Sequence, residues 1–161
     1  MRPFNRLVSW LTPSAVQVYS DGSAHERRGL PGGWAYVVVE RERPILEGSG
    51  GFKVADNHQV ELHAALEGLK AVAQLGSTRP TELISDSRVT LDIANGAEPP
   101  AAHTALGVEL RALCLRLQVT TRWVRGHSGN RWNEHVDRVA EAAKLALVPP
   151  RFKRKARRLR T

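Results

Sequence analysis

The chain has 161 residues, 42% of them hydrophobic, so it can bury a core of its own but is too short for two ordinary domains. Its 24 Lys and Arg residues outnumber its 16 Asp and Glu residues, yet seven of these cations lie within residues 151–160 and the remainder of the chain is nearly neutral. Cys114 is the single cysteine, which excludes an internal disulfide, and no apolar run approaches the length of a membrane span. We therefore expect one domain, a reducing cytoplasmic location and no membrane association.

The first part of the chain predicts a three-stranded antiparallel meander. Apolar, strand-forming residues run over 16–20, 34–39 and 45–52. The turn-forming stretch 29–33 and Pro44 separate them. The first strand stops at an aspartate, which makes its end a candidate for chemistry.

The next segment predicts a long helix that ends near Gly76. Asp56 stands where an N-cap is expected, and Gln59 follows three residues later in a capping-box pattern. The apolar stripe of this helix comprises Val60, Ala64, Leu66 or Gly68, Ala71 and Leu75.

The rest of the globular part alternates between strands and helices. We expect a strand at 82–85, a short helix from the Ser87 cap to Ala94, a helix at 104–117, a strand at 119–124, a polar loop at 125–130 and a helix at 132–147. The chain thus divides into an N-terminal extension, residues 1–14, a domain, residues 15–148, and a basic tail, residues 149–161. The extension contains Arg2 and Arg6 and no acidic residue, so mitochondrial targeting is the alternative to a cytoplasmic location.

Four carboxylates are candidate metal ligands: Asp21 and Asp86 at strand ends, Glu61 in the long helix, and Asp137 in the last helix. Neighbouring parallel strands present their carboxyl ends at one edge of a sheet, so the two strand aspartates should lie side by side. Ligands that are all oxygen atoms favour Mg²⁺ or Mn²⁺, and two such ions suit phosphodiester hydrolysis. His127, ten residues before Asp137, could relay a proton. Spacing alone leaves the ordinary alternatives open, namely turn aspartates, surface carboxylates and a loop histidine.

Five phrases in chain order, YSDGS at 19–23, NHQVEL at 57–62, ISDS at 84–87, WVRGHSGN at 123–130 and NEHVD at 133–137, resemble the type 1 ribonuclease H family. The resemblance covers residues 15–147. It implies an α/β, ribonuclease H-like fold, in which a five-stranded mixed sheet of three antiparallel and then two parallel strands is flanked by helices. It also implies an endonuclease that hydrolyses the RNA strand of RNA/DNA hybrids with two Mg²⁺ ions, or Mn²⁺, and leaves 5′-phosphate and 3′-hydroxyl ends.

The family pattern assigns roles to individual positions of this chain. Asp21, Glu61, Asp86 and Asp137 would be the metal ligands, and His127 would relay protons or aid product release. The substrate contacts implied by the resemblance are Gly22, Ser23, Asn57, Ser87, Arg88 and Asn133. Among these, Asn57 would touch the minor groove of the hybrid, where 2′-hydroxyls distinguish RNA from DNA.

Three departures from the family pattern affect substrate binding. The stretch between Asp86 and His127 is short and lacks a basic cluster, so we expect no basic substrate handle. Asp56 stands where the family often has Thr, and a carboxylate there would oppose a phosphate. Arg88 replaces an amide and could reach a backbone phosphate.

The basic tail could supply the missing charge by contacting phosphates, or it could be a solvated arm without a specific role. Its candidate contacts are Arg151, Lys153, Arg154, Lys155, Arg157 and Arg158. We expect a monomer whose partner is an RNA/DNA hybrid. The alternative functions are a non-catalytic nucleic-acid-binding module and a metal-dependent DNA nuclease of the same fold.

Overall fold

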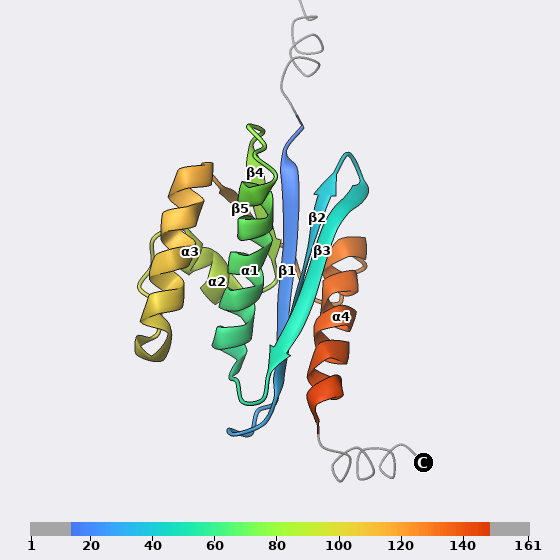
Figure 1. Ribbon diagram of the computed structural model, residues 1–161, viewed down its shortest axis with the longest axis vertical. Helices are drawn as coiled ribbons and strands as arrows, with labels where there is room; N and C mark the ends of the chain where they lie inside the picture. Colours follow the sequence, from blue (N-terminus) through green and yellow to red (C-terminus); the bar gives the residue numbers. More distant parts are fainter. Residues whose placement is uncertain (1–13, 149–161) are drawn as a thin grey trace, which may run out of the picture.

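The computed structural model describes residues 14–148, in which one mixed sheet carries helices on both faces (Figure 1). The strands are β1 (Val16–Ala24), β2 (Gly32–Glu40), β3 (Arg43–Phe52), β4 (Thr81–Ser85) and β5 (Thr120–Trp123), in the order β3-β2-β1-β4-β5. The pairs β1–β2 and β2–β3 are antiparallel, and β1–β4 and β4–β5 are parallel. The predicted fold class is confirmed. The predicted extension and tail lie outside the described residues, except for Ser14.

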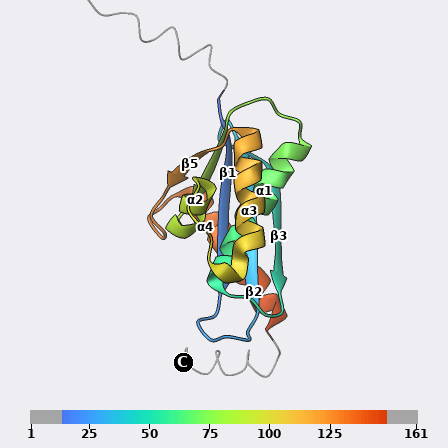
Figure 2. The same ribbon diagram turned by 90° about the vertical axis from the view of Figure 1, so that its left-hand side faces the viewer.

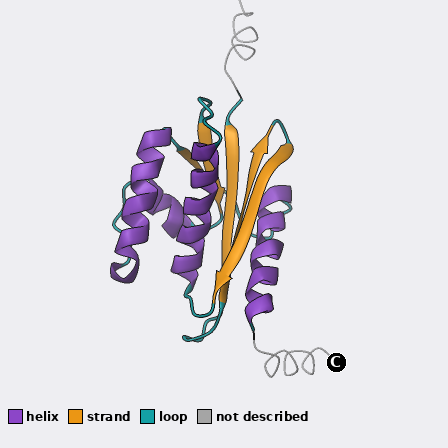
Figure 3. Ribbon diagram, viewed as in Figure 1, coloured by secondary structure: helices purple, strands orange, loops and turns teal. Residues whose placement is uncertain are grey.

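Helices cover the two faces of the sheet unequally (Figures 2 and 3). The helical elements are α1 (Asn57–Gln74), α2 (Arg88–Ala94), the 3-10 turn η2 (Ala101–His103), α3 (Thr104–Leu117) and α4 (Arg131–Leu147). The helix α1 packs on β1 and β2 with α3 against it, whereas α4 lies alone on the other face, across β1, β2 and β3. Within residues 14–148 no helix is long and apolar enough to cross a membrane.

Alternating residues of the central strands pack into two separate hydrophobic cores, one on each face of the sheet. Val18 and Val38 pack toward α1 together with Leu62 and other residues of the larger core. Their neighbours Tyr19 and Val37 point the other way, into the smaller core beneath α4. This alternation follows from the two-residue period of a strand, and it holds α1 and α4 on opposite sides of β1.

Side chains cap three of the helices at their N-termini. The Asp56 carboxylate accepts from the Gln59 amide N–H at 2.9 Å, and the Ser87 hydroxyl accepts from the Thr90 amide at 3.3 Å, so both predicted caps are confirmed. A third cap, in which the Asn130 side chain accepts from the amide N–H of the third α4 residue at 3.0 Å, starts α4 one residue earlier than predicted.

Several predicted strand limits were wrong, for reasons visible in the pairing. The first strand continues through Asp21 to Ala24, because its pairing with β2 persists as far as Gly32. The predicted turn at 29–33 therefore loses its last two residues to β2. Pro44 lies inside β3 rather than before it; β3 is an edge strand, and its pairing is irregular at this point, where proline is tolerated.

Two further differences concern element ends. The fifth strand is limited to Thr120–Trp123, shorter than the predicted 119–124. Leu75, expected in the apolar stripe of α1, is the C-cap residue and lies exposed beyond the last packed turn. The predicted range of α3 is confirmed, and Cys114 is buried in the core as expected.

Candidate metal centre

The parallel strands β1 and β4 bring Asp21 and Asp86 to equivalent positions. Their pairing runs as far as Tyr19 opposite Ile84. Each aspartate lies two residues beyond that last pair, so the two carboxylates have the same register although Asp21 is still inside β1 and Asp86 follows the end of β4. The predicted convergence of these two residues is therefore correct, while the prediction that Asp21 closes its strand was wrong.

Glu61 is brought to the same place by a close contact between α1 and β1. A Cβ atom at Gly22 would lie 2.6 Å from the Glu61 amide nitrogen and 2.7 Å from the Val60 carbonyl carbon. Only a residue without a side chain allows the first turns of α1 to approach β1 this closely. Glycine beside Asp21 is thus a condition for Glu61 to reach the cluster.

The acidic cluster has a strong effect on protonation. Asp21 is 6% exposed, and burial raises its pKa to about 8, with further increases from the charges of Asp86, Asp137 and Glu61. Burial also raises the pKa of Glu61, partly offset by a hydrogen bond from Ser87. Crowded carboxylates of this kind are stabilised in their charged form by a cation.

Neighbouring polar groups orient the carboxylates. Ser87 Oγ donates to Glu61 Oε2 at 2.5 Å, and the backbone N–H of Gly22 donates to Asp21 Oδ1 at 2.7 Å. Asn133, which is 1% exposed, donates from Nδ2 to Asp86 Oδ2 at 3.1 Å. The Oδ1 atom of Asn133 is buried without a hydrogen-bond partner, a group that a bound cation or its water could satisfy.

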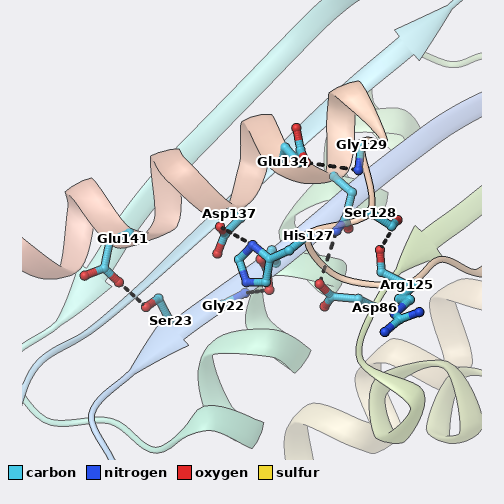
Figure 4. Close-up of polar contacts among 12 residues, drawn as sticks. Gly22, Ser23, Asp86, Arg125, His127, Ser128, Gly129, Glu134, Asp137 and Glu141 are labelled. Carbon is cyan, nitrogen blue, oxygen red and sulfur yellow. Dashed lines mark hydrogen bonds and ion pairs between the residues drawn. The ribbon is translucent and has the colours of Figure 1, made fainter.

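His127 lies at the solvent side of the cluster, on the loop that precedes α4 (Figure 4). Its side chain is 84% exposed, and its Nδ1 atom is 3.8 Å from Asp137 Oδ2. The residue adopts a φ of 52°, which is uncommon for a non-glycine residue. Hydrogen bonds from Ser128 Oγ to the Arg125 carbonyl and from the Gly129 N–H to Glu134 brace the loop on both sides of it.

The predicted substrate contacts occupy different positions relative to solvent. Asn57 is exposed at the start of α1, where its Oδ1 accepts from the Ala24 N–H at 3.2 Å. The Arg88 guanidinium stacks 3.9 Å from the ring centre of Trp123. Gly22, Ser87 and Asn133 have internal roles, as the contacts above describe.

The helix N-terminus at Asp56 differs from the phosphate subsite expected of the family. The Asp56 carboxylate accepts from His103 Nε2 at 2.8 Å, in addition to capping α1. Burial acts to raise the pKa of Asp56, but hydrogen bonds from the Gln59 amide and His103 outweigh it and the pKa is lowered. A carboxylate held in its charged form at this helix N-terminus would oppose a phosphate, and the loss of this subsite stays a prediction.

The donor set fits a divalent cation that keeps part of its water shell. Within residues 14–148, no three His, Cys, Asp or Glu side chains converge on a single metal position. Glu61 accepts a hydrogen bond from Ser87, and Asp86 accepts one from Asn133. Mg²⁺ is usually bound by only one or two carboxylates together with water and substrate phosphates. The arrangement therefore suits ions shared between the protein and a phosphodiester.

Two features near the cluster were missed by the sequence analysis. Glu141 and Lys144 contact Ser23, and their spacing of four and seven residues from Asp137 on one helix face could have indicated them. The pairing of His103 with the α1 cap has no local sequence signal, because the two partners are 47 residues apart.

A mixed sheet whose parallel strands bring carboxylates to one edge supplies the ligands that a cation-dependent enzyme acting on phosphodiesters needs. The family model for RNase H matches residues 13–144, and the chain belongs to the ribonuclease H family. The predicted family and enzyme class are confirmed by this membership.

The similarity to individual members extends over most of the chain. A ribonuclease H of Anaeromyxobacter dehalogenans (strain 2CP-C) is 35% identical to this chain, and the alignment covers 82% of this chain and 81% of the relative. A ribonuclease HI of Synechocystis sp. is 33% identical, covering 82% of this chain and 89% of its own. The crystal structure of an RNase H1 from Halobacterium salinarum NRC-1 superposes with a TM-score of 0.68 and 25% identity, over 81% of this chain and 97% of that one.

Proposed function

We propose that the protein is an endonuclease that hydrolyses the RNA strand of RNA/DNA hybrids and leaves 5′-phosphate and 3′-hydroxyl ends. The observation that carries the proposal is the equivalent register of Asp21 and Asp86 on parallel strands, in a cluster that raises the pKa of Asp21 to about 8. Asp21, Glu61, Asp86 and Asp137 would hold two Mg²⁺ ions, with Mn²⁺ as the alternative. Such ions activate water and stabilise the leaving oxygen.

Other side chains of the protein would orient the carboxylates and transfer protons. Asn133 and Ser87 keep the carboxylates of Asp86 and Glu61 oriented through the hydrogen bonds described above. His127, exposed and facing Asp137, would carry a proton between the site and solvent.

The hybrid would be recognised beside the cluster. Asn57 would contact the minor groove, where the 2′-hydroxyls of the RNA strand are displayed. Arg88, held over Trp123, would reach a backbone phosphate. Ser23 and Gly22 would lie beneath the RNA strand. The proposal includes action as a monomer and a location in the cytoplasm. The single cysteine, which cannot form an internal disulfide, fits a reducing compartment.

Cleavage of an end-labelled RNA/DNA hybrid in Mg²⁺ tests this function directly, with duplex DNA, duplex RNA and single-stranded RNA as parallel substrates. We expect cutting of the RNA strand of the hybrid alone, and no cutting by Asp86→Asn. Cutting of duplex DNA instead would indicate a DNA nuclease. Binding without any cutting in Mg²⁺ or Mn²⁺ would indicate a non-catalytic module.

The basic tail, which lies outside the described residues, is proposed to contact the hybrid backbone. Removing residues 151–161 should weaken hybrid binding and make log Kd less dependent on log salt, by about 0.9 for each phosphate that the tail neutralises in the full-length protein. The cleavage rate of bound hybrid in single-turnover conditions should stay the same, because the removed residues include none of the four carboxylates and not His127. Measuring Kd from 50 to 200 mM salt checks this; equal slopes for both proteins would rule out the tail contact.

A further inference from the structure

Next to the acidic cluster, β1 and α4 share a second polar contact formed by Ser23, Glu141 and Lys144. Ser23 Oγ donates to Glu141 Oε2 at 2.6 Å, as Figure 4 shows. The Lys144 ammonium donates to Ser23 Oγ at 2.9 Å and to Glu141 Oε2 at 2.6 Å. Lys144 is only 8% exposed. A buried ammonium is unfavourable unless it is paired and hydrogen-bonded, so both partners are needed to keep it there.

This contact lies next to the proposed metal ligands on both elements, two residues further along β1 and one turn further along α4. Asp21 and Ser23 are two residues apart on β1 and therefore lie on the same face of the strand. Asp137 and Glu141 are four residues apart on α4 and therefore lie one turn apart on the same face of the helix. The same strand and helix thus meet twice, first through two carboxylates and then through a serine and an ion pair.

The backbone of α4 rests directly on the sheet at this level. Gly33 of β2 is the cross-strand partner of Ser23. A Cβ atom at Gly33 would lie 2.5 Å from the Lys144 amide nitrogen and would also overlap the Ala140 carbonyl oxygen. The glycine allows close approach, but it supplies no attraction of its own; the polar contact of Ser23, Glu141 and Lys144 does.

Attraction at this point matters because the first meeting of the two elements is repulsive. In the charged form that binds a cation, the neighbouring Asp21 and Asp137 carboxylates repel each other, which favours separation of α4 from β1. The lysine and its partners lie one helical turn further on and pull the same two elements together. A site held in its bound geometry binds its ligand more tightly, because less free energy is spent on closing it.

We propose that Glu141 and Lys144 are positioning residues that hold α4 against β1 and so keep Asp137 in place for cation binding. This inference rests on the proposed function, because it takes the carboxylate cluster to be the cation site. Neither residue needs to touch the cation or the reacting phosphate. Their effect is exerted through Ser23 on β1 and through the helix on Asp137.

Calorimetric titration of the full-length protein with Mn²⁺ in the absence of nucleic acid tests the inference. Lys144→Met should raise the Kd for Mn²⁺ by about tenfold, equivalent to ~1.4 kcal/mol. The sign of the change is informative, because the variant makes the region more negative and a purely electrostatic effect would tighten cation binding. Ser23→Ala changes no charge and should weaken Mn²⁺ binding in the same direction, which covers the case that Lys144→Met does not fold.

Lys70→Met is the matched control. Lys70 also pairs with two carboxylates, those of Glu67 and Glu109 at 3.2 and 2.9 Å, but it joins α1 to α3 on the opposite side of the sheet. Its removal should leave Mn²⁺ binding unchanged. In hybrid cleavage, Lys144→Met should need more Mn²⁺ for half-maximal activity and recover the wild-type rate at saturation.

The possible outcomes separate the inference from the function on which it rests. Wild-type protein that binds no Mn²⁺ and also cuts no hybrid in Mn²⁺ would overturn the proposed function. Wild-type binding together with equal or tighter binding by Lys144→Met, or with unchanged binding by Ser23→Ala, would overturn the positioning role alone. An equal loss in Lys70→Met would also overturn it, because the effect would then follow from general destabilisation.

Discussion

Replacing Asp21 with asparagine should abolish hybrid cleavage and, in metal-free solution at pH 8, make the folded protein more stable. The amide has nearly the shape of the carboxylate but carries no charge. It therefore removes a proposed cation ligand, and it also removes the unfavourable effects of burial and of the charges of Asp86, Asp137 and Glu61 on Asp21. Loss of several kcal/mol of transition-state stabilisation lowers the cleavage rate by at least about a thousandfold.

The stability effect depends on pH in a defined direction. Burial and neighbouring charges raise the folded-state pKa of Asp21 from 3.8 to about 8. Between these values the folded state binds a proton more tightly than the unfolded state, so the free energy of unfolding of the metal-free wild type falls as pH rises through this window. Asparagine does not ionise, so the free energy of unfolding of the variant does not fall in this way. Its advantage should be small at pH 4 and reach a few kcal/mol above pH 8.

Urea unfolding in EDTA at pH 5 and pH 8 measures both proteins under comparable conditions. Added Mg²⁺ should then stabilise the wild type, whose cluster binds it, and have little effect on the variant. A variant that is less stable than the wild type at pH 8 in EDTA would show that Asp21 is not strained by its neighbours. The combination of lost activity and gained stability is expected of a site whose charges serve function at the expense of the fold.

Features determined by local chemistry were predictable from the sequence. Asp56 and Ser87 cap the helices that follow them, as predicted from the capping-box spacing of Asp56 to Gln59 and from the position of Ser87 before the short helix. The predicted range of α3 was correct because its apolar period and the Pro99-Pro100 loop before it are local signals. The four carboxylates were candidate ligands from their places in the predicted elements, but only the family motifs, which link distant segments, favoured a shared site over the ordinary alternatives.

Features that depend on pairing between segments were harder to predict from the sequence. The last apolar residue before Asp21 is Tyr19, so the sequence predicted a first strand over residues 16–20 that stops at Asp21. In the structure β1 continues because β2 supplies hydrogen-bond partners as far as Ala24. The sequence of β1 alone does not indicate those partners. The convergence of Asp21 and Asp86 nevertheless holds, because it depends on the register with β4 and not on where β1 stops.

Long-range polar contacts were the least predictable part of the site. Lys144 and Ser23 are 121 residues apart, and the charged residue lies in a helix whose solvent face also contains charges. Trp123 was visible as part of a motif, but its indole N–H bond to the Asp86 carbonyl and its stacking under Arg88 require the β4–β5 pairing. Such contacts decide which residues are held in place and which are free to meet substrate.

Gly22→Ala should reduce both stability and cleavage, the opposite of the Asp21→Asn combination. The added Cβ atom would lie 2.6 Å from the Glu61 amide nitrogen and 2.7 Å from the Val60 carbonyl carbon, and both are backbone atoms that cannot rotate away. Relieving the overlap requires α1 to move from β1, which opens the core beneath it and displaces Glu61 from Asp21. We expect a loss of about 2–4 kcal/mol, in the range of severe packing changes, and cleavage lower by about a hundredfold or more.

Gly29→Ala is the control for this substitution, because it makes the same chemical change in the loop between β1 and β2. A Cβ atom at Gly29 meets no atom within 4 Å, although the φ of 80° adds backbone strain of about 1–2 kcal/mol. Its cleavage rate in saturating Mg²⁺ should therefore stay near that of the wild type, even if its unfolding midpoint falls. If Gly22→Ala retained wild-type cleavage at a temperature where it is folded, the close approach of α1 to β1 would not be what places Glu61 in the site.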